Sequence, residues 1–417
     1  YAACVKVPNT NWLLITRMSA DMFQSDKTLE RQTDVQLVGW LAAALLILIL
    51  TLYDNNAQSV SKRNIGISVV LFVTSLLIIV IARMYPSSNM LEKTSISNFA
   101  QRAAFIDNYQ ELSEKIRSET PVFVPTGLFI QSVEFLSAHN VNITGNLWQR
   151  FEDTDEELVE HKVSFPLAIE QTISETYRDW NHYGELIIGY EFNVVLRHNF
   201  EYKKYPFDNK DIEFQIEFGD MSKNVMLVPD LESFTILGKK ENPAILDNIV
   251  LEEWELSESY FNYKYKHNKT NYGIDHHRAL EQPTLTYTIH LDREFISPFV
   301  TALLPVLVMV CLLYASIVSM PHTEYGELRN NMTAVIFTIL LAHYSIREHL
   351  QIDEVIYLEM FYFLLYIIAS IFLYLSHKFN TTLDSPKINN RYKVLAVDWY
   401  WPALTSMILI ITLFTFY

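Results

Sequence analysis

Residues 330–349 read NNMTAVIFTILLAHYSIREH, which is about the 20 residues that a helix needs to cross a membrane. Polar residues stand at both ends of this stretch, and Thr, His, Tyr and Ser stand inside it. A helix surrounded by lipid avoids such groups, because an unpaired polar group is costly in hydrocarbon. A helix that lines water can use them. The stretch therefore predicts a membrane helix with one wet face.

Five strongly apolar runs surround this stretch. Each approaches or reaches the ~20 residues of a membrane span, although a single run could also be the core helix of a soluble protein. Five such runs in one chain argue against a soluble protein, so we expect six membrane-spanning helices. The runs cover residues 37–53, 65–82, 295–320, 358–375 and 401–417.

The composition fits membrane segments joined to a sizeable polar domain. The chain has 417 residues, half of them hydrophobic, which is enough for two or three folded units. Only Cys4 and Cys311 are present, so no disulfide framework is predicted. The formal net charge of −16 argues against nucleic acid or anionic lipid as the main partner, and we expect no nucleic acid to bind.

Basic residues in two loops orient the spans. Under the positive-inside rule, loops rich in Lys and Arg lie in the cytoplasm. Both loops agree with one topology, in which residues 1–36, residues 84–293 and the C-terminus lie outside. The basic residues are Lys62 and Arg63 in the first loop, and Lys378, Lys387, Arg391 and Lys393 in the second.

The external stretch of about 200 residues reads mostly as β-structure. Apolar and polar residues alternate in several segments, and turn residues such as Pro206 and Gly219 separate them. Regularly spaced strands of this kind predict a β-sandwich. Residues 95–118 are polar and helix-compatible, so we expect a helical segment there. The clearest strand segments are 122–135, 185–202, 212–218 and 283–291.

The order of parts resembles the bacterial pentameric ligand-gated ion channels, members of the Cys-loop receptor superfamily. Several motifs carry the resemblance from Val122 to the C-terminus. Tyr205-Pro206-Phe207-Asp208 resembles the Pro-Phe-Asp loop of that family, without its flanking cysteines. Arg293 ends the last strand and precedes a helix with Pro305, as in the family. Further matches are Asn331–Thr333 and Leu341–His343 in the pore helix, Trp148 on the second strand, and Pro229-Asp230.

This resemblance implies a homopentamer in the bacterial inner membrane, so that each chain has four identical partners. The fold class is a membrane α+β protein: an extracellular immunoglobulin-like β-sandwich and a four-helix channel bundle, preceded by two additional membrane helices. The expected domains are 1–36, an external remnant; 37–83, the two extra helices; 84–120, a helical lead-in; 121–293, the sandwich; and 294–417, the channel, with the pore helix at about 328–350.

Residues 1–36 carry a second resemblance. The segment VPNTNWLLITRMSADMF, residues 7–23, looks like the closing strands of a Cache sensor domain just before its membrane helix. We therefore expect a larger extracellular Cache domain upstream of Tyr1. The alternative is an unrelated extracellular strand and turn.

A pore of five copies needs one water-facing stripe on its helix, at a spacing of three to four residues. Two stripes fit, and the sequence does not choose between them. In either case Leu341 or Leu340 would form a hydrophobic ring that can close the pore by dewetting, and Phe337 would form a second constriction. The first stripe is Asn330, Ala334, Phe337 or Thr338, Leu341, Ser345 and Glu348; the second is Thr333, Phe337, Leu340, Tyr344 and Glu348.

Charge selectivity depends on the ends of this helix. Five copies of Glu348 at the outer mouth would form a carboxylate ring that favours cations, although the adjacent Arg347 could oppose it. At the inner mouth the nearest acid is Glu327, with Arg329 between it and Asn330, which departs from the family pattern. We expect a cation channel.

Gating would require the sandwich to act on the helices. The resemblance places Tyr205, Pro206, Phe207, Asp208 and Arg293 at that junction, together with the loop 351–354 and the helix proline Pro305. We expect Arg293 to pair with Asp208 or a nearby acid. Such a pair could couple motion or be a structural salt bridge.

The ligand, an unknown small molecule or ion, would bind between subunits near the loop 267–282. Aromatic residues there could form a box for a cation, although Tyr and Phe are also common strand residues. The acidic run 152–160 could bind Ca²⁺ as a modulator, or be a solvated turn. The box candidates are Trp148, Phe261, Tyr263, Tyr265 and Tyr272, and the Ca²⁺ candidates are Glu152, Asp153, Asp155 and Glu156.

Two other function classes compete with a channel. A non-conducting membrane receptor with an external β-domain would suit the Cache-like start, but the cytoplasmic parts are short loops with no signalling domain. A transporter would show inverted repeats and broken helices, which the sequence lacks. No phosphate-binding loop, nucleophile triad or zinc-ligand spacing occurs, so we predict no enzymatic activity and no bound cofactor.

Overall fold

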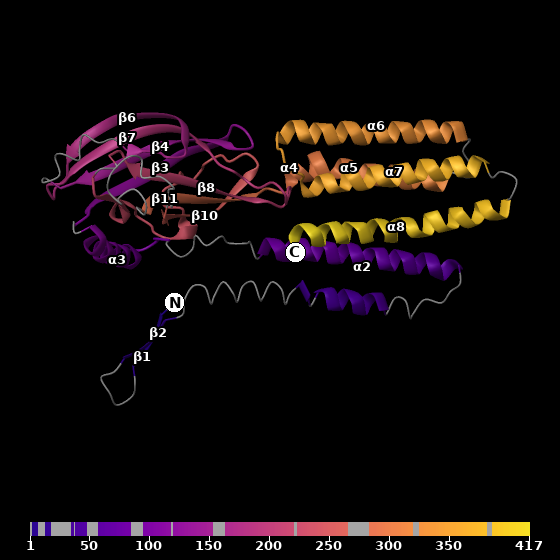
Figure 1. The fold of residues 1–417 in the computed structure, drawn as a ribbon, viewed down its shortest axis with the longest axis horizontal. Helices are drawn as coiled ribbons and strands as arrows, with labels where there is room; N and C mark the ends of the chain where they lie inside the picture. Colours follow the sequence, from indigo (N-terminus) through magenta and orange to yellow (C-terminus); the bar gives the residue numbers. More distant parts are fainter. Residues whose placement is uncertain are drawn as a thin grey trace. The chain divides into compact units, whose positions relative to one another are not determined.

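A computed structural model describes most of the chain (Figure 1). The described residues are 2–6, 13–17, 35–36, 38–47, 57–84, 95–117, 120–152, 163–220, 223–265, 283–319, 325–381 and 386–417. They form two compact units. The helical unit comprises Tyr1–Ser87, Tyr202–Phe207 and Phe295–Tyr417, and the sheet unit comprises Ser88–Glu201 and Asp208–Glu294.

The helical unit consists of long helices, with one short hairpin at its start. Strand β1 (Ala2–Lys6) pairs with β2 (Leu13–Arg17) in antiparallel register. The long helices are α2 (Ala57–Met84), α5 (Leu304–Ser319), α6 (Tyr325–Leu350), α7 (Tyr357–Thr381) and α8 (Pro386–Phe416). A short helix, α4 (Ile296–Pro298), and a π-helical turn, η6 (Phe299–Leu303), lead into α5.

Four of these helical segments are long and apolar enough to span a membrane: Lys62–Arg83, Ile296–Ser319, Tyr357–Leu375 and Ala396–Phe416. They coincide with four of the five apolar runs. The expected first span is described only over a shorter apolar helix, Val38–Ile47, and α6 is long but falls outside the apolar set. The prediction of a membrane-embedded protein is confirmed at this level.

Helix α2 is packed along α8, and the two lie side by side in Figure 1. The Asn64 side chain donates from Nδ2 to the Asp398 carbonyl oxygen at 2.9 Å, and Asn64 itself is buried. At the other end of α2, Ile78 and Ile79 join Tyr357 and Phe416 in a buried apolar cluster. Helix α2, one of the two additional helices expected from the sequence, therefore packs as part of the helical unit.

The sheet unit contains two sheets and the helix α3 (Phe99–Arg117). One sheet has the strand order β10-β11-β8-β5, and the other has the order β6-β7-β4-β3-β9. All pairs are antiparallel except β3 with β9. The strands are β3 (Val122–Phe135), β4 (Asn140–Phe151), β5 (Val163–Ser164), β6 (Ala168–Trp180), β7 (Leu186–Arg197), β8 (Asn209–Phe218), β9 (Val225–Pro229), β10 (Trp254–Tyr265) and β11 (Pro283–Arg293).

The two sheets bury their facing side chains against each other. Along β4, buried residues alternate strictly with half-buried ones, as the period-two pattern predicts. The rings of Phe192 on β7 and Phe214 on β8 lie 5.1 Å apart, and Phe165 contacts both. The Tyr263 hydroxyl on β10 donates to the Leu227 carbonyl oxygen on β9 at 2.8 Å. A shared aromatic core thus joins the sheets.

Candidate functional site

Helix α6 is buried along one narrow row. Met332, Ile339 and Ile346 are buried at intervals of seven residues, and the helix packs against α5 and α7. Seven residues are close to two turns of an α-helix, so these three side chains lie on one line. The rest of the helix is half-buried or exposed, and α6 lies at the edge of the helical unit in Figure 1.

The opposite face of α6 carries the first predicted stripe. At about 100° per residue, Leu341 lies about 180° from Met332, and Asn330 and Glu348 lie within about 20° of Leu341. Leu341 is 55% exposed and Phe337 is 61% exposed. Thr333, Leu340 and Tyr344 of the second stripe are also exposed; Thr333 and Leu340 lie about 80–100° from Leu341, and Tyr344 lies about 60° from it, as far as Thr338 of the first stripe. The exposed members of the first stripe are Asn330, Ala334, Phe337, Thr338, Leu341, Ser345 and Glu348.

The threonines of α6 satisfy their hydroxyl groups within the helix. Thr333 donates to the Arg329 carbonyl oxygen at 2.9 Å, and Thr338 donates to the Ala334 carbonyl oxygen at the same distance. Each hydroxyl keeps its oxygen lone pairs for water or an ion. The polar residues of α6 are therefore compatible with both a membrane environment and a wet face.

A buried carboxylate anchors the C-terminal half of α6 to α7. Glu359 on α7 is fully buried, and it bonds Arg347 through both carboxylate oxygens. Arg347 also donates from Nη1 to the Ile352 carbonyl oxygen at 2.8 Å. The backbone N–H of Ile356 donates to Glu359 at 3.1 Å. These contacts close the loop between α6 and α7.

His343 adds a second link from α6 to the same carboxylate. Its Nε2 lies 3.2 Å from Glu359 Oε1, and its Nδ1 lies 3.3 Å from the Tyr366 hydroxyl. Its ring also stacks on Tyr362, with centroids 5.2 Å apart. The polar residues on this side of α6 therefore bond to α7, which distinguishes them from those on the exposed stripe.

Arg347 and Glu348 are neighbours in sequence but point to different surroundings. The Arg347 guanidinium is committed to Glu359 and to a backbone carbonyl, whereas Glu348 is exposed. Because the positive charge is neutralised at α7, it offsets Glu348 less than the sequence suggested. Glu327 and Arg329, near the other end of α6, are both exposed.

The segment Tyr202–Phe207 is bound to the helical unit at the start of α7. The backbone N–H of Tyr202 donates to the Glu354 carboxylate, and the Tyr357 N–H donates to the Lys203 carbonyl oxygen at 2.8 Å. Tyr205 is buried, and its peptide bond to Pro206 is cis. The predicted junction residues Tyr205 and Pro206 thus lie in a segment that contacts the loop before α7.

Phe207 inserts its ring among the ends of three helices. Its centroid lies 5.6 Å from Phe295 before α4, 6.2 Å from Tyr357 on α7 and 6.2 Å from Phe416 on α8. It also packs against the cluster of Ile78 and Ile79 on α2. A displacement of Phe207 would therefore change its contacts with α2, α7 and α8 at the same time.

In the sheet unit, the expected pair of Arg293 and Asp208 is present. Arg293 binds the carboxylate with two bonds, Nε to Oδ1 at 2.7 Å and Nη2 to Oδ2 at 3.1 Å. Lys210 Nζ lies 2.9 Å from Asp208 Oδ2, and Glu253 accepts from Arg293 Nη1 at 2.9 Å. The Arg293 guanidinium also lies over the Trp254 ring, 4.0 Å from its centroid.

This cluster is almost completely buried. The side chains of Asp208, Lys210 and Arg293 are 3%, 1% and 3% exposed. Burial alone would raise the pKa of Asp208, but the charges of Lys210 and Arg293 outweigh it and lower the pKa below the ordinary value. Asp208 is therefore ionised over the whole neutral range and acts as the shared anion of two buried cations.

Pro305 lies at the start of α5, directly after the π-helical turn η6. The backbone N–H of Leu304 donates to the Phe299 carbonyl oxygen, five residues earlier. Proline has no N–H to continue the ladder, so an irregular turn before it is expected. The irregular turn therefore lies next to the expected helix proline Pro305, in the first half of this span.

Two of the proposed ligand-binding aromatics are buried in the sheet unit. Tyr263 is fully buried and stacks on Phe105 of α3, with centroids 3.7 Å apart. Phe261 is buried against Tyr287. Tyr265 is exposed, and Tyr272 lies outside the described residues, like the loop 267–282. Phe261 and Tyr263 thus have packing roles, and the aromatic box itself stays a prediction.

Trp148 belongs to a polar cluster that fixes its indole. Its Nε1 donates to Asp230 Oδ2 at 2.8 Å, and Arg150 bonds the other oxygen of the same carboxylate. Glu232 accepts from Arg150 at 2.8 Å and from Arg102 of α3 at 3.0 Å. Trp148 and Asp230, matched separately to the family, are therefore direct partners.

His290 forms the clearest titratable pair on the sheet unit. Its Nδ1 lies 2.5 Å from Asp211 Oδ1, and its Nε2 lies 3.8 Å from Asp292 Oδ1. The hydrogen bond to Asp211 raises the pKa of His290, with further support from the charges of Asp292 and Glu258. This pair gives the sheet unit a pH-dependent contact, because the protonated form of His290 is favoured beyond its ordinary pKa of 6.5.

The proposed Ca²⁺ site falls largely outside the described residues. Glu152 is exposed, whereas Asp153, Asp155 and Glu156 lie in the segment 153–162, outside the described residues. Within the part of the chain that the structure describes, no group of three or more His, Cys, Asp or Glu residues could hold a metal ion. The Ca²⁺ site stays a prediction.

Glu359, Lys210 and Glu253 are functional candidates that sequence reasoning missed. A signal existed for Glu359, because it is an acid at the start of the apolar run 358–375, and an acid within a membrane helix needs a partner. Lys210 and Glu253 carry no such signal. Both lie among alternating strand and turn residues, where charged side chains usually face water.

The sequence matches no protein-family model, and a comparison with curated proteins found no match.

Proposed function

We propose that five copies of this chain form a ligand-gated ion channel in a bacterial inner membrane, with a preference for cations. In this proposal the sheet unit is an extracellular immunoglobulin-like sandwich, and α5 to α8 form the channel bundle around a pore lined by α6. The proposal includes no enzymatic activity and no required cofactor. The ligand, a small molecule or ion, would act between neighbouring sandwiches.

The exposed polar stripe of α6 carries the proposal. Its buried row faces α5 and α7, and the face about 180° away carries Asn330, Leu341 and Glu348. In a ring of identical subunits, the face turned away from each subunit's own helices points toward the symmetry axis. This geometry favours Leu341 over Leu340 as the leucine nearest the axis, because Leu340 lies about 100° from Leu341 and would contact the neighbouring copy of α6.

The ends of the stripe support cation selectivity. Five exposed Glu348 carboxylates would concentrate cations at the outer mouth, and Arg347 is bound to Glu359 instead of opposing them. Five Leu341 side chains would form the hydrophobic constriction that closes the pore by excluding water.

The chain crossings between the units support a gating role. The chain leaves the sheet unit after Glu201, returns at Asp208, and leaves again after Glu294. Asp208 is held by Arg293 in the sheet unit, and Phe207 is held by helix ends in the helical unit. A rearrangement of the sandwich would therefore reach α2, α7 and α8 through the backbone bond between Phe207 and Asp208.

The direct test is a planar-bilayer recording of the purified chain in asymmetric salt, at several pH values and with and without Ca²⁺. We expect unitary currents that reverse near the cation potential and a smaller cation preference in Glu348→Gln. Reversal near the chloride potential would retain the channel and contradict the role of Glu348. A monomeric chain that never conducts would favour a non-conducting receptor with an external sandwich.

Cysteine accessibility tests the stripe itself. In a background with Cys4 and Cys311 replaced by Ser and Ala, we expect a charged thiol reagent to alter the current of Leu341→Cys. Met332→Cys, on the buried row, is the matched control and should not respond. A response of Leu340→Cys in place of Leu341→Cys would support the second stripe.

A further inference from the structure

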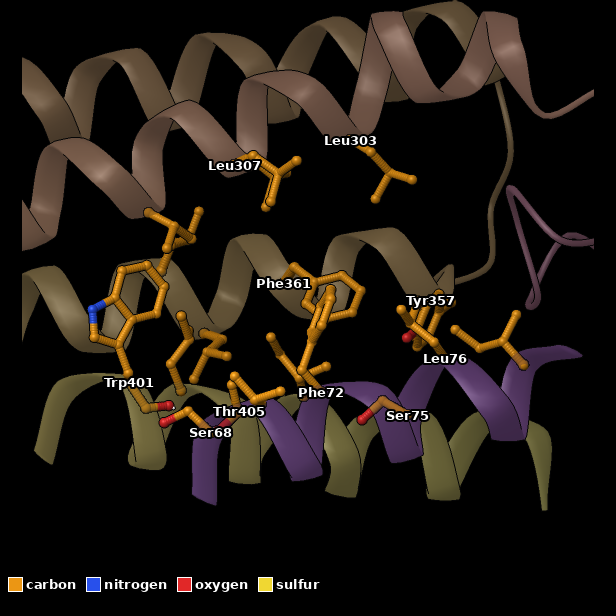
Figure 2. Close-up of a pocket in the computed structure, with 18 of the residues that line it drawn as sticks. Ser68, Phe72, Ser75, Leu76, Leu303, Leu307, Tyr357, Phe361, Trp401 and Thr405 are labelled. Carbon is orange, nitrogen blue, oxygen red and sulfur yellow. Dashed lines mark hydrogen bonds between the residues drawn. The ribbon is translucent and has the colours of Figure 1, made fainter. Parts of the chain in front are cut away.

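The helical unit contains an elongated, partly open cavity of about 550 Å³ between α2 and α5, with α7 and α8 completing its walls. Figure 2 shows Leu303 of η6 and Leu307 of α5 on one side and Phe72 and Leu76 of α2 on the other. Phe361 of α7 and Trp401 of α8 also line this space. The extra helix α2 therefore supplies a wall that α5, α7 and α8 alone would lack.

The walls offer almost nothing to a polar ligand. Ser68 donates its hydroxyl to the Asn64 carbonyl oxygen at 2.8 Å, and Ser75 donates to Leu71 at 3.0 Å. Thr405 bonds the Trp401 carbonyl oxygen at 2.8 Å, and the Tyr357 hydroxyl pairs with Thr412 at 2.8 Å. Among the described residues, no acidic or basic side chain lines the cavity. Its occupant must be apolar.

The shape of the cavity suits a linear molecule. On α2 its lining extends from Ile65 to Ile79, which is about 21 Å along the helix axis. Along η6 and α5 it extends from Phe299 to Val310, which is about 16 Å. These lengths cover half to two thirds of a hydrocarbon core of about 30 Å. A compact apolar ligand would leave much of the cavity unfilled.

The cavity opens at the outer surface of the helical unit. Phe72, Leu76 and Leu307 line it, yet each keeps between 43% and 46% of its surface exposed. An empty apolar space of this size would forfeit many van der Waals contacts, and water would find no hydrogen-bond partners in it. For a helix set that spans a bilayer, the molecule at this surface is a lipid.

We propose that this cavity is a binding site for one acyl chain of a membrane phospholipid, held between α2 and α5. The bound chain would fill the space between the extra helix and the channel helices, from Ser68 to the ring of Phe207. It would thus fix the distance of α2 from α5. The proposal requires a membrane-embedded protein and does not depend on ion conduction.

Photolabelling in vesicles tests this site. The full chain is reconstituted in phosphatidylethanolamine vesicles that contain a phosphatidylcholine with a diazirine midway along one acyl chain, and labelled residues are mapped by mass spectrometry. We expect the label to concentrate on Phe72, Leu303 and Phe361, whose side chains line the cavity. Equal labelling of exposed membrane-helix residues outside it, such as Ile367 and Ile371, would overturn the proposal.

Adjacent residues supply matched variants for the same experiment. Leu307→Trp on α5 and Leu76→Trp on α2 place an indole in the cavity, and labelling should fall by roughly tenfold because close packing leaves no room for the chain. Val308→Trp and Leu77→Trp add the same group at neighbouring exposed positions outside the cavity, and labelling should persist. Either pair is sufficient if a variant of the other misfolds. Unchanged labelling in both filled variants would contradict the site.

Discussion

Replacing Asp208 with Asn is the most informative change in the sheet unit. Asp208 is the shared anion of Lys210 and Arg293, and all three side chains are at most 3% exposed. Asp208→Asn keeps the shape of the residue but leaves two buried cations facing a neutral amide. Breaking a buried ion pair in this way costs about 3–5 kcal/mol. Because Arg293 keeps Glu253 and the Trp254 ring, we expect about 3 kcal/mol.

For a folded unit of this size, about 3 kcal/mol corresponds to a fall in Tm of about 6–12 °C. The assay is thermal unfolding of the full chain in detergent at neutral pH, followed by tryptophan fluorescence, because Trp254 lies against Arg293. The pKa of Asp208 lies below its ordinary value of 3.8, so its stabilising charge is present above that value and is lost only as the pH falls below it. Neutral pH therefore measures the full effect.

Two further variants decide whether the effect comes from the buried charges. Asp247→Asn makes the same chemical change at an exposed loop position of the same unit and should shift Tm by less than about 2 °C. Adding Lys210→Met to Asp208→Asn removes one uncompensated cation and should restore part of the loss. An Asp208→Asn protein as stable as Asp247→Asn would refute the reasoning.

Three other outcomes are expected. The protonated His290 should stabilise the sheet unit below pH 6.5, and this contribution should fade as the pH rises through its raised pKa. Asp211→Asn should therefore flatten the dependence of Tm on pH across that range. An unchanged dependence would contradict the pairing of His290 with Asp211. Glu359→Gln should cost about 3 kcal/mol by leaving Arg347 without a carboxylate, measured as a lower Tm of the helical unit, and equal stability would exclude this anchor. Leu341→Thr should raise the resting current in bilayer recordings by wetting the constriction, and an unaltered current would argue against a Leu341 ring.

The strands and spans were largely predictable because their signals are local. Alternation along β4 and the apolar runs of α5, α7 and α8 depend on neighbours within a few residues, and the structure has these elements in those places. The membrane-type mixture of helices and sheets is confirmed. Pentameric assembly, the sandwich class and the ion preference remain proposals.

The predicted pairing of Arg293 with Asp208 came from a motif, whereas the depth of its burial did not. Nothing in the local sequence around Lys210 indicates that it joins the same carboxylate, because a lysine in a strand usually points to water. The burial of Phe261 and Tyr263 was likewise not predictable from the local sequence. Aromatic residues near a binding loop look alike in sequence whether they line a site or pack in a core.

By itself, the sequence determined the membrane character of the chain, its β-rich stretch of about 200 residues and a helix too polar to face lipid on all sides. These properties follow from composition and from periodicities of two and 3.6 residues, which depend only on residues close together in the sequence. Only the tertiary structure decided that Arg347 turns away from Glu348 toward Glu359, and that α2 joins α5 around an apolar cavity. Neighbouring residues of a helix are about 100° apart, so what each one contacts depends on the packing of distant segments against it.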